Sequence, residues 1–199
     1  MNSYKTFDGD SAEILFKDKN SKFFGFGFPI EAVDEAKPLI DYLRKQHFGA
    51  GHFCYAYQVG VDSIQFRTND DGEPNNSAGM PIYGQIQSAG ITNVLIVVVR
   101  YFGGTKLGVS GLISAYKTAT QMVIEKADVI EKTIFVNFLI SFDYKNLNKV
   151  MRIIKEKNLA IIAQKMELSC EIKIVSPKKN AKIIFDIFND LFEIEIKAI

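Results

Sequence analysis

Residues 94–116 constrain the fold more than any other part of the chain. Residues 94–99 are almost wholly apolar and β-branched, which is typical of a strand covered on both faces. Arg100 and a glycine-rich turn follow, and residues 112–123 repeat apolar side chains at the spacing of one helix face. The turn contains Gly103, Gly104, Gly108 and Gly111. We predict a buried strand, a glycine loop and a long helix with Ser110 as its N-cap.

This strand, loop and helix start could hold an anion. Free backbone N–H groups and the helix dipole favour negative charge at a helix N-terminus, and Arg100 and Lys106 add two cations. The glycine spacing matches neither a dinucleotide fingerprint nor a P-loop. The alternative is that the glycines only permit tight turns with positive φ. The candidate ligand-binding residues here are Arg100, Tyr101, Gly103, Gly104, Lys106, Gly108 and Ser110.

Residues 69–81 form a second dense stretch, with Asp70, Asp71 and Glu73 within four residues. Three carboxylates this close repel one another unless cations neutralise them or backbone N–H groups donate hydrogen bonds to them. They could bind a divalent cation, although the spacing does not match an EF-hand. They could instead cap turns and the next helix. In a third interpretation they brace the neighbouring loop, with Arg100 paired to Asp71 in a buried network. We therefore add these three acidic residues to the candidate site and assign no metal.

The remaining periodicity predicts an α+β protein in two domains, residues 1–130 and 131–199. The first has strands at 13–17, 22–28, 52–59 and 64–67, with helices from about 34 and at 81–89. Residues 128–133 are expected to be a charged hinge. The second domain has the order β-α-β-β-α-β of the ferredoxin-like arrangement. The helix predicted at 145–157 presents three cations on one face, Lys145, Lys149 and Arg152, which complete the list of candidate binding residues.

Composition narrows the classes of function. The net charge is +1, so any nucleic-acid contact depends on local clusters of cations. Cys54 and Cys170 lie far apart and outside any CxxC pair, which argues against structural zinc or a disulfide framework. No run is apolar and long enough for a signal peptide or a membrane span. We expect a cytoplasmic protein without a membrane association or a cofactor.

Several blocks resemble the IMPACT family in its bacterial, YigZ-type form (uncharacterised protein family 0029). The matching blocks are residues 21–23, 52–57, 70–74, 77–81, 98–108, 111–112 and 115–116, so the resemblance covers essentially the whole chain. It implies an N-terminal domain with the ribosomal protein S5 domain 2-like fold. It also implies a C-terminal ferredoxin-like domain similar to domains III and V of elongation factor G. The second expectation agrees with the periodicity of residues 134–199.

The resemblance also bears on function. Eukaryotic relatives restrain translational control with an additional RWD domain, for which we expect no room before Ser21, so that role is not carried over. The leading hypothesis is a translation-linked module, without catalysis, that binds RNA, the ribosome or a translation factor. Arg100 and Lys106 would then contact phosphate, and Tyr101 or Phe102 would stack on a base. The alternatives are a metal-assisted enzyme acting on a phosphorylated small molecule, and a structural module for protein interaction.

Overall fold

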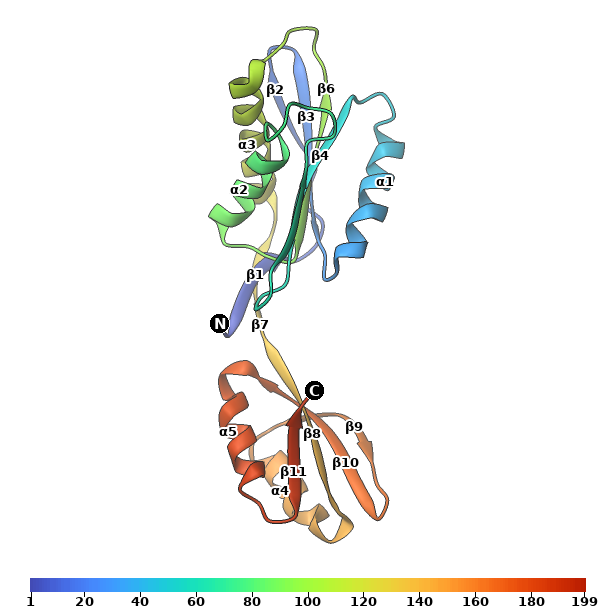
Figure 1. Cartoon of the computed structure of the whole chain (residues 1–199), viewed down its shortest axis with the longest axis vertical. Coiled ribbons are helices and arrows are strands. Elements are labelled where there is room, and N and C mark those ends of the chain that lie inside the picture. The colour runs from blue at the N-terminus through green and yellow to red at the C-terminus, as the bar shows by residue number, and fades with distance from the viewer. The chain divides into compact units, whose positions relative to one another are not determined.

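The computed structural model describes all residues, 1–199, and divides into two compact units (Figure 1). The N-terminal unit is Tyr4–Lys132. The C-terminal unit is Thr133–Ile199 together with Met1–Ser3. Both units combine an antiparallel sheet with helices, so the protein is α+β. None of the helices is both long enough and apolar enough to cross a membrane.

The N-terminal unit is built on a five-stranded antiparallel sheet of order β2-β3-β6-β4-β5. Helices α2 and α3 cover one face and α1 covers the other (Figure 1). Its strands are β1 (Ser3–Phe7), β2 (Ile14–Asp18), β3 (Ser21–Pro29), β4 (His52–Val59), β5 (Gln65–Asn69), β6 (Val94–Tyr101) and β7 (Val129–Thr133). Its helices are the 3-10 turn Val33–Glu35, α1 (Ala36–Gln46), α2 (Gly79–Ala89) and α3 (Gly108–Lys126).

Strand β6 is the centre of this unit, as its apolar sequence predicts. Its residues from Val94 to Arg100 are all buried. Ile96 and Val98 pack in the cluster under α2 and α3, whereas Val97 and Val99 pack in the cluster under α1. A strand with helices on both faces has no polar side to present, and this explains its continuous apolar run.

Two glycines of β3 let the layers approach closely. A Cβ at Gly25 would lie 2.5 Å from Cγ2 of Val123 on α3, and one at Gly27 would lie 2.8 Å from the Phe7 ring. The alternating aromatic residues of β3 point to the other face, where Phe24 and Phe26 pack against the α1 cluster. The bare face of β3 is therefore a site of tight helix packing and leaves no room for a ligand.

The C-terminal unit follows the element order expected from its periodicity, β-α-β-β-α-β. Its elements are β8 (Phe135–Asp143), the 3-10 turn Tyr144–Asn146, α4 (Leu147–Glu156), β9 (Ala160–Lys165), β10 (Ser169–Pro177), α5 (Lys178–Asn189) and β11 (Ile194–Ala198). The antiparallel sheet has the order β11-β8-β10-β9. Alternate residues such as Phe138, Ile140 and Phe142 enter one core with α4 and α5, so both helices cover the same face.

Two local predictions are wrong. The expected hinge at 128–133 contains strand β7, which forms a two-stranded sheet with β1 near the N-terminus. The expected N-cap Ser110 lies inside the first turn of α3, because the helix already begins at Gly108 and its N-cap is Leu107. Gly108 has a φ of +76°, which lets the chain turn into the helix three residues earlier than a cap at Ser110 would.

Candidate functional site

The loop between β5 and α2 and the loop between β6 and α3 meet around Arg100. This residue is the penultimate one of β6, and it lies opposite Phe23 on β3 and His52 on β4. It belongs to the face of the sheet that α2 and α3 cover, because Val98, two residues earlier, packs in that cluster. The sheet therefore places a guanidinium group under two loops at the end of its central strand.

Arg100 forms a buried ion pair with Glu73. Its Nη1 lies 2.7 Å from Oε1 of Glu73, and the two side chains are only 5% and 4% exposed. Nη2 donates to Oγ of Ser21 at 3.4 Å. The guanidinium carbon also lies 5.5 Å from the ring centres of both Phe23 and Phe102. Arg100 is therefore held between protein groups, and only its Nε has no hydrogen-bond partner.

This arrangement corrects two expectations for Arg100. Its acidic partner is Glu73, whereas the sequence suggested Asp71. Because the charge of Arg100 is already balanced by a buried carboxylate, it is not a free cation that could contact a phosphate from solvent. The interpretation of the two loops as braced against each other is the one that these contacts support.

Glu73 also receives a chain of hydrogen bonds from two neutral donors. The hydroxyl of Tyr116 on α3 donates to Oε1 of Glu73 at 2.8 Å, and the thiol of Cys54 on β4 donates to the Tyr116 hydroxyl at 3.2 Å. Burial raises the pKa of the Tyr116 hydroxyl and of the Cys54 thiol well above their ordinary values, and the Glu73 charge acts in the same direction. Both groups therefore stay protonated, and neither is an activated nucleophile.

The loop between β5 and α2, here called the acidic loop, carries two further carboxylates, Asp70 and Asp71, and each has its own protein partners. Oδ1 of Asp70 accepts the backbone N–H groups of Ala78 and Gly79, at 2.9 and 2.8 Å, where α2 begins. Its Oδ2 accepts that of Asn76 at 2.9 Å. Asp71 binds Nη2 of Arg44 at 2.8 Å and accepts the N–H of Phe53 at 2.6 Å.

The acidic loop is therefore a capping and bracing element. Metal binding would require Asp70, Asp71 and Glu73 to converge on one cation. In the structure Asp70 accepts backbone N–H groups at the start of α2, Asp71 accepts the N–H of Phe53, and Glu73 pairs with Arg100. No group of three acidic, histidine or cysteine side chains in the protein is arranged to hold a metal ion. Each of the three carboxylates accepts hydrogen bonds from protein donors, so all three help to hold the two loops in place.

The remaining candidate residues are divided among several places. Tyr101 faces the α1 side of the sheet, and its hydroxyl lies 3.0 Å from Nδ1 of His47. The N–H of Gly103 donates to Oγ of Ser21 at 3.2 Å. Gly104 turns with a φ of +87°, and Ser110 is exposed in the first turn of α3. Lys106 is exposed and makes no ion pair.

The three cations predicted on one helix belong to the C-terminal unit. Lys145 lies in the turn before α4 and forms an ion pair with Glu193 at 2.7 Å, which raises the pKa of Lys145 through their hydrogen bond. Arg152 lies 3.6 Å from Glu156 within α4. Lys149 is exposed and has no acidic partner within 4 Å. Carboxylates therefore offset two of these three charges.

Arg100, Glu73, Tyr116 and Cys54 together form what we call the Arg100 cluster. A cavity of about 350 Å³ opens beside it. Its lining includes Glu73, Pro74, Arg100, Phe102, Lys106, Leu107, Gly108, Val109 and Leu112. The walls are mainly apolar, and Phe102 and Val109 are more than half exposed, at 54% and 53%. Lys106 is the only unpaired cation of this lining. The cavity thus combines apolar contact area with one available positive charge.

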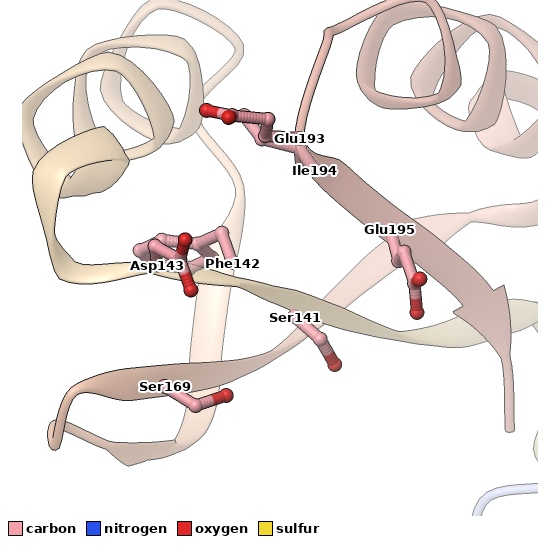
Figure 2. A pocket seen from close by; sticks show the side chains of 7 residues that line it. All are labelled: Ser141, Phe142, Asp143, Ser169, Glu193, Ile194 and Glu195. Carbon is pink, nitrogen blue, oxygen red and sulfur yellow. The ribbon is translucent and has the colours of Figure 1, made fainter.

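Sequence reasoning missed a second hollow, of about 480 Å³, in the C-terminal unit (Figure 2). It lies where β8, β10 and β11 meet, and its polar groups include Ser141, Asp143, Ser169, Glu193 and Glu195. Strand alternation could have indicated part of this set, because Ser141 and Asp143 share one face of β8. The hollow is acidic, so it does not complement phosphate groups.

Comparisons with known proteins agree with this architecture. The model of the Impact N-terminal domain matches residues 19–124. The chain therefore belongs to the IMPACT family. It is 32% identical to IMPACT family member YvyE of Bacillus subtilis (strain 168) over 162 residues, which cover 81% of this chain and 74% of that protein. It is also 32% identical to IMPACT family member YigZ of Escherichia coli (strain K12) over 134 residues, 66% of each chain.

A solved structure resembles the whole chain. The crystal structure of a protein described as hypothetical covers 100% of this chain and 98% of its own, with a TM-score of 0.76 and 25% sequence identity. Both units of the present protein therefore have counterparts in one known chain.

Proposed function

We propose that this IMPACT family member is a cytoplasmic binding module that acts on the translation machinery and catalyses no reaction. Its ligand is RNA, the ribosome or a translation factor. The N-terminal domain, residues 1–130 by sequence, would have the ribosomal protein S5 domain 2-like fold. The C-terminal domain, 131–199, would have the ferredoxin-like fold of elongation factor G domains III and V. The strand order β11-β8-β10-β9 supports the second assignment, since it is 4-1-3-2 in the order of those strands along the chain.

One observation carries the proposal of binding without catalysis. Every charged group of the Arg100 cluster has an internal partner, whereas Lys106 and the ring of Phe102 remain available around the adjacent cavity. Cations that contact phosphate and aromatic rings that stack on bases are the two elements of RNA binding without a deep catalytic pocket. Recognition is therefore assigned to the cavity rim, and Arg100 is assigned the role of fixing the two loops.

The enzymatic alternative lacks the groups that it needs. The buried thiol and hydroxyl are held protonated, and the three carboxylates accept hydrogen bonds from backbone, arginine and tyrosine donors. A nucleophile and a base within reach of each other are the minimum for covalent catalysis, and the Arg100 cluster offers no such pair. We therefore favour binding over catalysis at this site.

Gradient sedimentation of lysate, at low and at high salt, tests the proposal. We expect the protein to migrate with ribosomal subunits at low salt and to dissociate at high salt. The double variant Lys106→Glu with Phe102→Ala should migrate as a free small protein. Lys117→Glu, an exposed position on α3 outside the cavity lining, is the matched control and should behave as the wild type. Migration of the wild type as a free protein at both salts would contradict the proposal.

A further inference from the structure

A groove of about 300 Å³ lies on the opposite face of the five-stranded sheet from the Arg100 cluster. It runs between α1 and the strands β4 and β5, the second of which is an edge strand of the sheet. The residues that matter for its chemistry are Lys37, Asp41, Arg44, Tyr55, Tyr57 and Arg67. None of them belongs to the lining of the cavity beside Phe102.

The floor of the groove is aromatic. Tyr55 and Tyr57 are two residues apart on β4, so their side chains point to the same face. Both are partly exposed, and neither hydroxyl has a hydrogen-bond partner in the protein. Buried tyrosine hydroxyls normally find a partner, whereas these two are left beside an open groove. They offer ring faces for stacking and two unused hydrogen-bonding groups.

The walls of the groove are mainly cationic. Arg67 lies on the edge strand β5 directly opposite Tyr57, and Lys37 lies in the first turn of α1. Neither makes an ion pair. Arg44 is already paired with Asp71 and lies 4.6 Å from the ring centre of Phe53, so it is a fixed part of the wall. Asp41 is the only carboxylate of the lining, so beside the paired Arg44 the groove holds two cations without ion-pair partners and one acid, a net charge of +1.

We propose that this groove binds a short segment of single-stranded RNA. Bases stack on Tyr55 and Tyr57, while Lys37 and Arg67 contact the flanking phosphates; aromatic platforms beside cations are the common means of holding single strands. The free tyrosine hydroxyls suit the 2′-hydroxyl of ribose, which is both a donor and an acceptor. The inference rests on the proposed function only for the choice of RNA over other polyanions.

Fluorescence anisotropy with a labelled 12-nucleotide oligouridine and the purified full chain tests this assignment. We expect Tyr57→Ala to weaken binding by about tenfold or more, since loss of one stacked base costs roughly that factor. Tyr57→Phe keeps the ring and should lose much less. Arg67→Gln should weaken binding and reduce the slope of log affinity against log salt by about 0.7, the value for one phosphate contact on a single strand.

Matched controls and contrary outcomes separate this site from the cavity beside Phe102. Tyr42→Ala on α1 and Lys117→Gln on α3 remove exposed side chains outside the groove and should leave binding unchanged. Circular dichroism of each variant establishes that it is folded.

Three results would overturn the groove assignment. They are failure of the wild type to bind oligouridine at low salt, equal displacement by a polyglutamate peptide, and loss of binding in Lys106→Glu with normal binding in Tyr57→Ala. Ribosome co-sedimentation without oligouridine binding would overturn the groove alone, whereas oligouridine binding without co-sedimentation would overturn the proposed function alone.

Discussion

The carboxylate of Glu73 lies 2.7 Å from the guanidinium of Arg100, and it simultaneously accepts the hydroxyl proton of Tyr116 at 2.8 Å. A single buried side chain therefore ties the end of β6, the loop before α2 and the third turn of α3. These segments are remote in sequence, and their loops form the cavity to which we assign binding. The ion pair thus sets the position of the surface that is expected to contact a ligand.

Breaking this pair should destabilise the protein strongly. Glu73→Ala leaves Arg100 buried without a counter-charge, and removal of one partner of a buried pair costs about 3–5 kcal/mol. We expect the free energy of unfolding from urea titration to fall by that amount. Glu167→Ala removes an exposed partner of Lys165 and should cost less than about 1 kcal/mol. Similar losses in the two variants would contradict the buried-pair interpretation.

Gly103 should tolerate no side chain. A Cβ there would lie 2.1 Å from the carbonyl carbon of Asn20 and 2.3 Å from the nitrogen of Ser21, both of which are backbone atoms in the turn between β2 and β3. Gly103→Ala should therefore lower thermal stability and displace the loop. Gly84→Ala, inside α2 with open space around the added carbon, should raise stability by about 0.5–1 kcal/mol. Calorimetry of both variants checks the contrast in sign.

The buried thiol and hydroxyl predict a loss of stability at alkaline pH. Burial raises the pKa of Cys54 and of Tyr116 above their ordinary values of 9.0 and 10.0, so the folded state keeps protons that the unfolded chain releases. Stability should therefore be constant with respect to these groups below about pH 8. It should fall as pH rises through 9, by about 1.4 kcal/mol per pH unit for each group that the unfolded chain has deprotonated.

Urea titrations between pH 7 and 10.5 measure this slope. Cys54→Ser keeps a donor to Tyr116 but does not ionise in this range, so its curve should decline less steeply than that of the wild type. In the folded wild type, Cys54 should also resist iodoacetamide at pH 8.5, because the thiolate is the reactive species. Rapid labelling of Cys54 in the native protein would show that the thiol ionises and would contradict the prediction.

Two lysines face each other on the β2–β3 hairpin. Lys17 and Lys22 are directly paired across the strands, and neither has an acidic partner within 4 Å. Like charges in such positions are unfavourable, and opposite charges contribute roughly 0.2–1 kcal/mol. Lys22→Glu should therefore raise the melting temperature at low salt, and the gain should shrink at high salt. An unchanged melting temperature at low salt would argue against direct repulsion.

Much of the fold could be predicted from the sequence because its signals are local. The apolar run of β6, the inner face of α3 and the alternation of β8 each depend on neighbouring residues alone. The prediction of a hinge at 128–133 is wrong because strand β7 is short and charged, and its partner β1 lies more than 120 residues earlier. A pairing between two segments so far apart in sequence cannot be detected from the residues next to either one.

The candidate site was predictable only in outline. The sequence indicates that acidic and basic loops could meet, but the choice of partner depends on turn geometry. Asp71 and Gly72 both have positive φ, at +42° and +87°, and this turn directs Asp71 toward Arg44 while Glu73 reaches Arg100. The roles of Cys54 and Tyr116 were missed because each reads as an ordinary inward-facing residue of its element. The groove lined by Tyr57 and Arg67 forms only when α1 packs against the sheet, so no local sequence pattern indicates it.

The pairing of β1 with β7 has a consequence for how the chain can be divided. Met1–Ser3 groups with the C-terminal unit, so that unit is made of two separate stretches, and Tyr4–Lys132 stands between them as an inserted domain. A cut after residue 130 would fall within β7 and divide the strand that pairs with β1. The unit boundaries themselves, after Ser3 and after Lys132, also fall within β1 and β7, so the β1–β7 ribbon stays intact only when both stretches remain in one piece.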